Sequence, residues 1–372
     1  MGIYSHASFL CYPMLAVPRL INYLRFCCCS VVLLLTASGG LYASTEPLVA
    51  PQSQSLWKIQ QPLMGTLFTI KVYTDSHQRA QRACEQAFAI AQELQDTLSA
   101  KDACSELTKL NAASSLAPYS ISETMAHALS IALFYAKASH GAFDPTLGTC
   151  LRLWHQSHTR HTLPSAQDLA RARASSGWQH LSISGSGSGS HKTATKAIEG
   201  LRIDLGGIGK GIAVDAMAHC LQEAGLTRFC ISSTSDVLVG DPPPNKTAWE
   251  VALGSSSSPA ITFHLVNEAI STSGDQHQFI IINGTRYSHI IDPKTGMGLT
   301  SQRQVTVRAK TATEADALST ACCVLSDEES QLLLRQCPNA KLIYDTNDHK
   351  KGREATISSS AHLTPSGELT AG

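Results

Sequence analysis

A glycine-rich turn at residues 206–211 places a lysine where it could bind an anion. The apolar segment 201–205 precedes the turn, a helical pattern follows it, and Lys210 lies near the expected start of that helix. Backbone N–H groups and the helix dipole favour an anion at such a start, and a lysine adds a point charge. The turn is not a Walker A loop, because Asp204 and Gly211 stand where that motif needs Gly and Ser or Thr. A turn that serves only tight packing of strand against helix is the alternative.

A second set of polar side chains lies on one expected helix, residues 312–325. Asp316 and Thr320 are four residues apart, and Ser319 lies on nearly the same face. A carboxylate with hydroxyl groups is an oxygen ligand set that suits Mg²⁺ carrying a phosphate. The alternative is a solvated first turn in which Asp316 only complements the helix dipole.

A third candidate group is His289, which we expect in a strand just ahead of Asp292-Pro293. An imidazole can act as a general base near neutral pH. The chain has 15 histidines, so a structural role is the alternative. Residues 142–145, Ala-Phe-Asp-Pro, offer backbone groups and a phenyl ring to a ligand, or form a simple turn.

Hydrophobic periodicity predicts the elements that must position these groups. Asn283-Gly284 is a strong hairpin signal, and Thr311 with Glu314 forms the pattern of a capping box. The Ser-Gly run at 184–190 predicts a loop. We expect helices over 76–98, 122–139, 165–177, 213–221 and 312–325. We expect strands over 64–73, 201–205, 278–282, 286–291 and 304–308.

The order of these elements predicts an α+β fold with mixed sheets and segregated helices, because strands and helices do not alternate as βαβ repeats. The charges balance, with 29 Lys and Arg against 29 Asp and Glu. This balance excludes a strongly basic nucleic-acid binder, so we expect no nucleic acid partner. The 12 cysteines include no C-x-x-C pair, and we interpret the eight beyond residue 29 as small buried hydrophobic side chains.

The first residues have the pattern of a secretory signal. Arg19 and Arg25 precede an apolar stretch at 26–35, and Leu41-Tyr42-Ala43 offers a cleavage site. We therefore expect a signal peptide at 1–43, a flexible leader at 44–56, a main domain at 57–345 and a disordered tail at 346–372. An uncleaved stretch that anchors the protein in a membrane is the alternative.

Taken in order, these motifs resemble those of the FAD:protein FMN transferase (ApbE-type) family. The resemblance spans about residues 57–345 and rests on Met64-Gly-Thr66, Ser105-Glu-Leu107 with Asn111, Gly141-Ala-Phe-Asp-Pro-Thr146 with Leu153-Trp154, Ile203-Asp-Leu-Gly-Gly-Ile-Gly-Lys-Gly211 with Asp215, Ser271-Thr-Ser-Gly-Asp275, Tyr287-Ser-His-Ile-Ile-Asp-Pro-Lys-Thr-Gly296 and Glu314-Ala-Asp-Ala-Leu-Ser-Thr320.

The resemblance implies a periplasmic enzyme with a T-fold-like core, Mg²⁺ as cofactor and FAD as substrate. Such an enzyme transfers FMN to a Thr or Ser of an acceptor redox protein and releases AMP; an uncleaved signal would attach it to the inner membrane. Matching positions imply His289 as base, with Asp316 also catalytic. They imply Mg²⁺ ligands at Gly207, Asp316, Ser319 and Thr320. They imply FAD contacts from Met64, Lys101, Ala142, Phe143, Asp144, Asp204, Lys210 and Ile291.

Two positions depart from the family pattern. Lys101 replaces a tyrosine that would stack on a ring, and Thr234-Ser235 replaces two glycines before Asp236. These departures keep two alternatives open, an Mg²⁺-dependent FAD pyrophosphatase and a flavin-binding protein without catalysis. Two structural expectations follow. Gly207 must meet the helix that bears Asp316, and Asp316→Ala should largely keep folding, because we expect that carboxylate to be partly exposed.

Overall fold

The computed structural model describes residues 54–185, 191–253, 261–275 and 278–345, which we call the described residues. The helices are α1 (His77–Leu98), α2 (Glu106–Ala112), α3 (Glu123–Ala138), α4 (Gly148–Arg160), α5 (Ala166–Ala174), α6 (Gly209–Glu223), α7 (Ala312–Val324), α8 (Asp327–Arg335) and the 3₁₀ turn η1 (Trp178–His180). The strands are β1 (Ser55–Leu63), β2 (Thr66–Thr74), β3 (Tyr119–Ile121), β4 (Leu181–Ser184), β5 (Lys192–Lys196), β6 (Phe229–Ser232), β7 (Asp236–Val239), β8 (Trp249–Leu253), β9 (Ile261–Leu265), β10 (Glu268–Gly274), β11 (Phe279–Ile282), β12 (Thr285–Ser288), β13 (Gln304–Ala309) and β14 (Lys341–Asp345).

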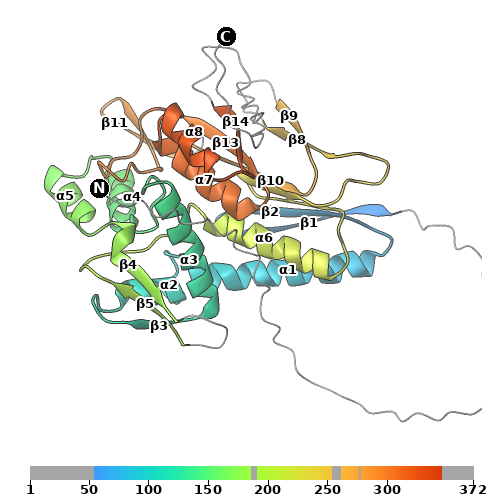
Figure 1. Ribbon diagram of the computed structural model, residues 1–372, viewed down its shortest axis with the longest axis horizontal. Coiled ribbons are helices and arrows are strands. Elements are labelled where there is room, and N and C mark those ends of the chain that lie inside the picture. Colours follow the sequence, from blue (N-terminus) through green and yellow to red (C-terminus); the bar gives the residue numbers. More distant parts are fainter. Residues whose placement is uncertain (1–53, 186–190, 254–260, 276–277, 346–372) are drawn as a thin grey trace, which may run out of the picture. The chain divides into compact units, whose positions relative to one another are not determined.

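A seven-stranded antiparallel sheet forms the centre, in the order β1-β2-β6-β7-β10-β13-β14. Helices α1, α6 and α7 lie against one face of this sheet (Figure 1). In β2, the fully buried residues Phe68, Ile70 and Val72 alternate with less buried ones, as period-two strand geometry requires. The β8–β9 hairpin, which includes Trp249, packs on part of the sheet and forms a separate apolar cluster with it.

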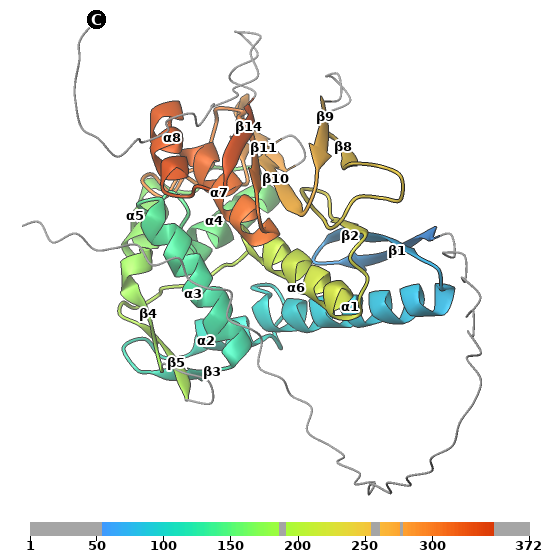
Figure 2. The same cartoon turned by 45° about the vertical axis from the view of Figure 1, so that its right-hand side comes forward.

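Small residues allow the three helices to pack closely. The buried stripe of α1 includes Ala80, Ala83, Ala87 and Ala91. Figure 2 shows α6 running beside α1 and leading toward α7. A Cβ atom on Gly211 would lie 2.6 Å from the Ala312 carbonyl oxygen. Glycine is therefore needed at the α6–α7 crossing.

Smaller sheets surround the central layer. The β3-β5-β4 sheet packs near α3, and the β11–β12 hairpin shares an apolar cluster with α4 and α5. Trp154 of α4 belongs to this cluster, and its indole N–H donates to the Gly296 carbonyl oxygen at 2.8 Å. The turn that follows His289 is thereby tied to α4.

The predicted helices are confirmed, and side-chain caps explain the starts of all of them except α6. The hydroxyls of Ser76, Ser122, Ser165 and Thr311 each accept a backbone N–H in the first turn of α1, α3, α5 and α7. Asn283 and Gly284 both have positive φ, at 51° and 77°, as the tight β11–β12 turn requires. The α+β class is also confirmed.

Several local predictions are wrong. Segment 201–205 is not a strand, because the Asn111 side chain takes both backbone groups of Ile203 and leaves only one bridge, between Leu147 and Arg202. The predicted strand 64–73 is a strand only from Thr66, since Met64 has a positive φ of 50° in the β1–β2 turn. All strand pairs in the described residues are antiparallel, so the sheets are not mixed.

Parts of the sequence predictions fall beyond the described residues. The expected signal at 1–43, the tail at 346–372 and residues 186–190 of the Ser-Gly run lie there, whereas β1 begins at Ser55, inside the expected leader. Within the described ranges, no helix is both long and apolar enough to cross a membrane. Seven of the eight described cysteines are buried, and Cys104 is exposed.

Candidate active site

The glycine turn that precedes α6 meets α7, as predicted. The Asp204 carboxylate holds the turn by accepting the Gly206 N–H at 2.8 Å. A Cβ atom on Gly207 would lie 3.5 Å from the Thr320 hydroxyl oxygen and 3.2 Å from the Phe143 ring. The backbone of Gly207 therefore lies between α7 and the loop after α3, where a side chain would intrude.

Lys210 forms a charged cluster with two buried carboxylates, which we call the Lys210 cluster. Its ammonium lies 3.4 Å from Asp316 Oδ2 and 3.8 Å from Asp236 Oδ2. Asp316 Oδ2 also accepts the Gly211 N–H at 3.0 Å. Asp316 is 2% exposed and Asp236 fully buried, so the expectation of a partly exposed Asp316 is wrong. Its position at the α6–α7 crossing explains the burial.

Burial controls the protonation of this cluster. Burial and the neighbouring Asp236 together raise the pKa of Asp316 to about 7, against the opposing effect of Lys210 and the hydrogen bonds. Burial lowers the pKa of Lys210, but Asp316 and Asp236 outweigh it and raise that pKa above its ordinary value. When Asp316 is ionised, two carboxylates share one ammonium, and the negative charge left over is one that a further cation would balance.

Hydroxyl groups surround the two carboxylates. Ser273 Oγ lies 2.8 Å from Ser319 Oγ and 3.1 Å from Thr320 Oγ1. Ser233, Ser235 and Ser271 all donate hydrogen bonds to Asp236, at 2.8, 2.7 and 2.6 Å. The site is therefore rich in oxygen donors from β7, β10 and α7.

His289 was predicted to lie in a strand, but β12 ends at Ser288, so His289 lies just beyond it. Its Nδ1 lies 3.1 Å from the Gln278 carbonyl oxygen. A carbonyl can only accept, so Nδ1 carries the hydrogen and the neutral ring keeps a lone pair on Nε2. The ring is exposed, yet the atoms around it desolvate it, and this desolvation lowers the pKa of His289 below its usual 6.5.

The other predicted FAD contacts are distributed over four segments. Met64 lies in the β1–β2 turn, where its N–H donates to Gln95. Ala142 and Phe143 lie in the loop after α3, and Ile291 is buried in the α4–α5 cluster. Lys101 is exposed on the turn between α1 and α2, and its side chain has no hydrogen bond or ion pair within the described residues.

Asp144 closes the loop that carries Ala142 and Phe143. Its carboxylate accepts hydrogen bonds from the Thr146 N–H at 2.8 Å, the Thr146 hydroxyl at 2.6 Å and the Trp178 N–H at 3.2 Å. Burial raises its pKa, and these bonds oppose the rise. Asp144 thus fixes the loop that lies against the glycine turn.

The structure adds three residues to the predicted site. Asp236 shares Lys210 with Asp316, and Ser273 links Ser319 to Thr320. Asp215 of α6 accepts the N–H groups of Ala312 and Thr313 at 2.8 and 2.9 Å, which joins α6 to the start of α7. Asp215 and Ser273 belong to the family motifs quoted above, and Asp236 directly follows the departure at Thr234-Ser235. These positions were the sequence signal that could have identified the three residues.

A cation site in this region would be built mostly from hydroxyl and carbonyl oxygens. Among the described residues, no group of three or more His, Cys, Asp or Glu could hold a metal ion. The predicted ligands are Asp316, Ser319, Thr320 and the Gly207 carbonyl. They include only one carboxylate, so this set differs from a cluster of three or more His, Cys, Asp or Glu.

Solved structures of two flavin transferases share this fold. The apo form of the Pseudomonas stutzeri flavinyl transferase ApbE matches with a TM-score of 0.69 and 28% identity, over 78% of this chain and 91% of that one. The flavin transferase ApbE of Vibrio cholerae matches with a TM-score of 0.70 and 26% identity, over 78% of this chain and 94% of the other.

Relatives with the name FAD:protein FMN transferase match at the sequence level. The Treponema pallidum protein is 30% identical over 310 residues, 79% of this chain and 86% of its own length. The Klebsiella pneumoniae protein is 30% identical over 312 residues, which cover 80% of this chain and 86% of its own length. The protein is therefore an α+β enzyme of the transferase class. More narrowly, the ApbE family model matches residues 64–343, and the chain belongs to that family.

Proposed function

We propose that the protein is an Mg²⁺-dependent FAD:protein FMN transferase. It would move FMN from FAD to a Thr or Ser hydroxyl of an acceptor redox protein and release AMP. The observation that carries the proposal is the Lys210 cluster beside the glycine turn, because it joins a fixed cation to two buried carboxylates at one place.

The residues of this site fit a magnesium ion. Asp316, Ser319, Thr320 and the Gly207 carbonyl are all oxygen donors, which Mg²⁺ prefers. The second carboxylate, Asp236, leaves the cluster with a negative charge that a divalent cation would offset. When bound, Mg²⁺ would supply Lewis acidity toward the pyrophosphate oxygens.

The glycine turn and Lys210 would hold the pyrophosphate of FAD. The Lys210 ammonium, which Asp316 fixes in place, and the N–H groups of Gly207 and Lys210 are the donors. The neighbouring N–H groups already donate within the protein, to Asp204, Leu205 and Asp316. Preorganised donors of this kind stabilise the charge that develops during phosphoryl transfer. Phe143, which lies against Gly207, would border a ring of the substrate.

His289 would activate the acceptor. Its Nε2 lone pair takes the proton of the acceptor hydroxyl, and the hydroxyl oxygen forms a bond to the phosphorus of the FMN moiety. The pyrophosphate bond to the adenylate oxygen breaks, and AMP leaves with that oxygen. The hydrogen bond from Nδ1 to the Gln278 carbonyl oxygen keeps the ring in the tautomer that this step needs.

The same proposal includes export to the periplasm. It is supported by the apolar stretch 26–35 with Arg19 and Arg25 before it, which has the pattern of a signal. The acceptor would then be a periplasmic or membrane-associated redox protein.

A transfer assay tests the function. The purified protein is incubated with FAD, Mg²⁺ and an acceptor, and flavin fluorescence on a denaturing gel is measured together with AMP. We expect both products, and expect Lys210→Met to lower the rate by about 10²–10³, as for other single donors to a developing charge. Lys137→Met, on the exposed end of α3, is the matched control. Absence of bound flavin and of AMP with every acceptor tried would refute the proposal.

A pyrophosphatase is the second candidate, because His289 is exposed and water can reach it. Water would then replace the acceptor hydroxyl, and free FMN and AMP would form. Chromatography of a reaction without acceptor distinguishes the two activities: FMN released at the rate of transfer favours the pyrophosphatase.

A further inference from the structure

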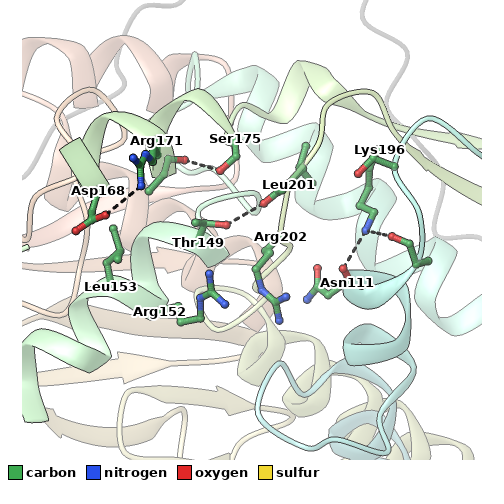
Figure 3. Close-up of a pocket in the computed structure, with 14 residues that line it drawn as sticks. Asn111, Thr149, Arg152, Leu153, Asp168, Arg171, Ser175, Lys196, Leu201 and Arg202 are labelled. Carbon is green, nitrogen blue, oxygen red and sulfur yellow. Dashed lines mark hydrogen bonds and ion pairs between the residues drawn. The ribbon is translucent and has the colours of Figure 1, made fainter. Parts of the chain in front are cut away.

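A pocket of about 380 Å³ shares no lining residue with the Lys210 cluster (Figure 3). Its walls come from α2, α4, α5, the end of β5 and residues 200–202. None of its lining residues belongs to the sets assigned above to flavin, metal or proton transfer. We call it the arginine pocket.

The arginine pocket carries an excess of positive charge. Arg152, Arg171, Lys196 and Arg202 line it, against the single carboxylate of Asp168. Asp168 lies 3.9 Å from Arg171 of the same helix. Within the described residues, no carboxylate forms an ion pair with Arg152, Lys196 or Arg202.

Lys196 supplies a buried cation at one end of the pocket. It is 3% exposed, and its ammonium donates to the carbonyl oxygens of Asn111 and Ala113 at 3.0 and 2.7 Å. These two bonds use two of its three hydrogens. Burial lowers the pKa of Lys196, and the nearby charge of Arg202 lowers it further. A bound anion would relieve this repulsion.

Backbone contacts bring Arg152 and Arg202 to the same place. The Gly148 N–H donates to the Arg202 carbonyl oxygen at 3.0 Å, and a Cβ on Gly148 would lie 2.8 Å from that oxygen. Arg152 is four residues beyond Gly148 on α4, and therefore on the same helix face. Figure 3 shows the two side chains entering the pocket from these separate segments.

We infer that the arginine pocket binds a small organic phosphate, at a second site separate from the flavin site. Two guanidinium groups suit the planar, bidentate recognition of a phosphate, and Lys196 has a hydrogen left to donate. The partly exposed Leu153 offers apolar contact to the organic part of the ligand. The volume lies within the range of about 300–1,000 Å³ for small-molecule sites.

Calorimetric titration with inorganic phosphate and with ribose 5-phosphate tests the inference at low ionic strength. Ribose 5-phosphate has neither a flavin nor an adenine ring. We expect saturable binding of both, tighter for ribose 5-phosphate, and weaker at high salt. The double variant Arg152→Ala, Arg202→Ala should lose at least tenfold in affinity. Arg160→Ala, on the same helix but outside the pocket, is the matched control and should bind as the wild type does.

Single variants guard against misfolding of the double variant. Arg152 is exposed on a helix surface where Ala is a strong helix former, so Arg152→Ala should fold and lose several-fold in affinity. The inference is wrong if no saturable binding occurs, if the Arg152 and Arg202 variants bind as the wild type does, or if an acidic peptide binds there and ribose 5-phosphate does not. Phosphate binding that survives in the double variant but is lost in Lys210→Met would assign the anion to the glycine turn. That result would also overturn the inference.

Discussion

Burial gives the single residues of the Lys210 cluster their properties. Asp316 is the clearest case, since its carboxylate accepts the Gly211 N–H and faces Lys210 with almost no exposure. Removing the Asp316 side chain leaves the Gly211 N–H without its acceptor, and an unmade hydrogen bond in a buried place costs stability. Asp316→Ala is therefore expected to lower stability as well as activity, and Asp316→Asn is the better test of its chemistry.

The protonation of His289 gives a prediction at the same scale. The base must be neutral, and desolvation lowers the pKa of His289 below 6.5. The pKa of Asp316 is raised to about 7 without metal, so the profile is measured at saturating Mg²⁺, which would hold that carboxylate ionised. Activity should then fall only as the pH drops below 6.5. His289→Ala should slow transfer by about 10²–10⁴, as expected for loss of a general base. The measurement is the rate of covalent flavin formation as a function of pH. An acidic limb above 6.5, or an unchanged rate in His289→Ala, would exclude His289 as the base.

Two helices, α6 and α7, together build the site. Gly211 allows their close crossing, and Asp215 of α6 accepts N–H groups at the start of α7. The crossing sets Lys210 against Asp316 and Gly207 against Thr320. The geometry of the charged cluster therefore depends on how these two elements pack.

Gly211→Ala tests this dependence. Its Cβ would lie 2.6 Å from the Ala312 carbonyl oxygen and 2.7 Å from Thr313 Cα, which are backbone atoms that cannot rotate away. We expect a loss of about 1–3 kcal/mol in the free energy of unfolding, measured with denaturant. Gly209→Ala is the matched control, because a Cβ there meets nothing within 4 Å. Equal stability of the two variants would show that the crossing tolerates a side chain.

At the scale of the whole molecule, the balanced net charge hides local charge. The chain has as many acidic as basic residues, yet the Lys210 cluster holds spare negative charge and the arginine pocket spare positive charge. Binding a cation to the folded state alone stabilises the whole chain by mass action.

Magnesium should therefore raise the thermal unfolding midpoint. At 100 times the dissociation constant, the gain is about 2.7 kcal/mol. We expect a rise with Mg²⁺ at constant ionic strength, its reversal by EDTA, and no rise in Asp316→Asn. Asp96→Asn, exposed on α1, is the control that should behave as the wild type does. A full Mg²⁺ response in Asp316→Asn would remove Asp316 from the proposed metal site.

The sequence alone determined what depends on near neighbours in the chain. Thr311 with Glu314 predicted a helix start, because a cap bonds within its own first turn. Asn283-Gly284 predicted the hairpin, because the turn needs two residues with positive φ. The family motifs identified the glycine turn, and the meeting of Gly207 with α7 followed from them. Helices α2, α4 and α8 were not predicted, although Ser105 and Ser326 cap α2 and α8.

Only the tertiary structure decided the contacts between distant segments. Asn111 satisfies the backbone of Ile203, 92 residues away, and so prevents a strand there. Asp236 joined the site and Asp316 became buried because β7, α6 and α7 converge. No local pattern encodes such convergence, since burial and charge pairing depend on which surfaces meet when the chain packs. For the same reason, the arginine pocket became visible only after α4 was placed against residues 200–202.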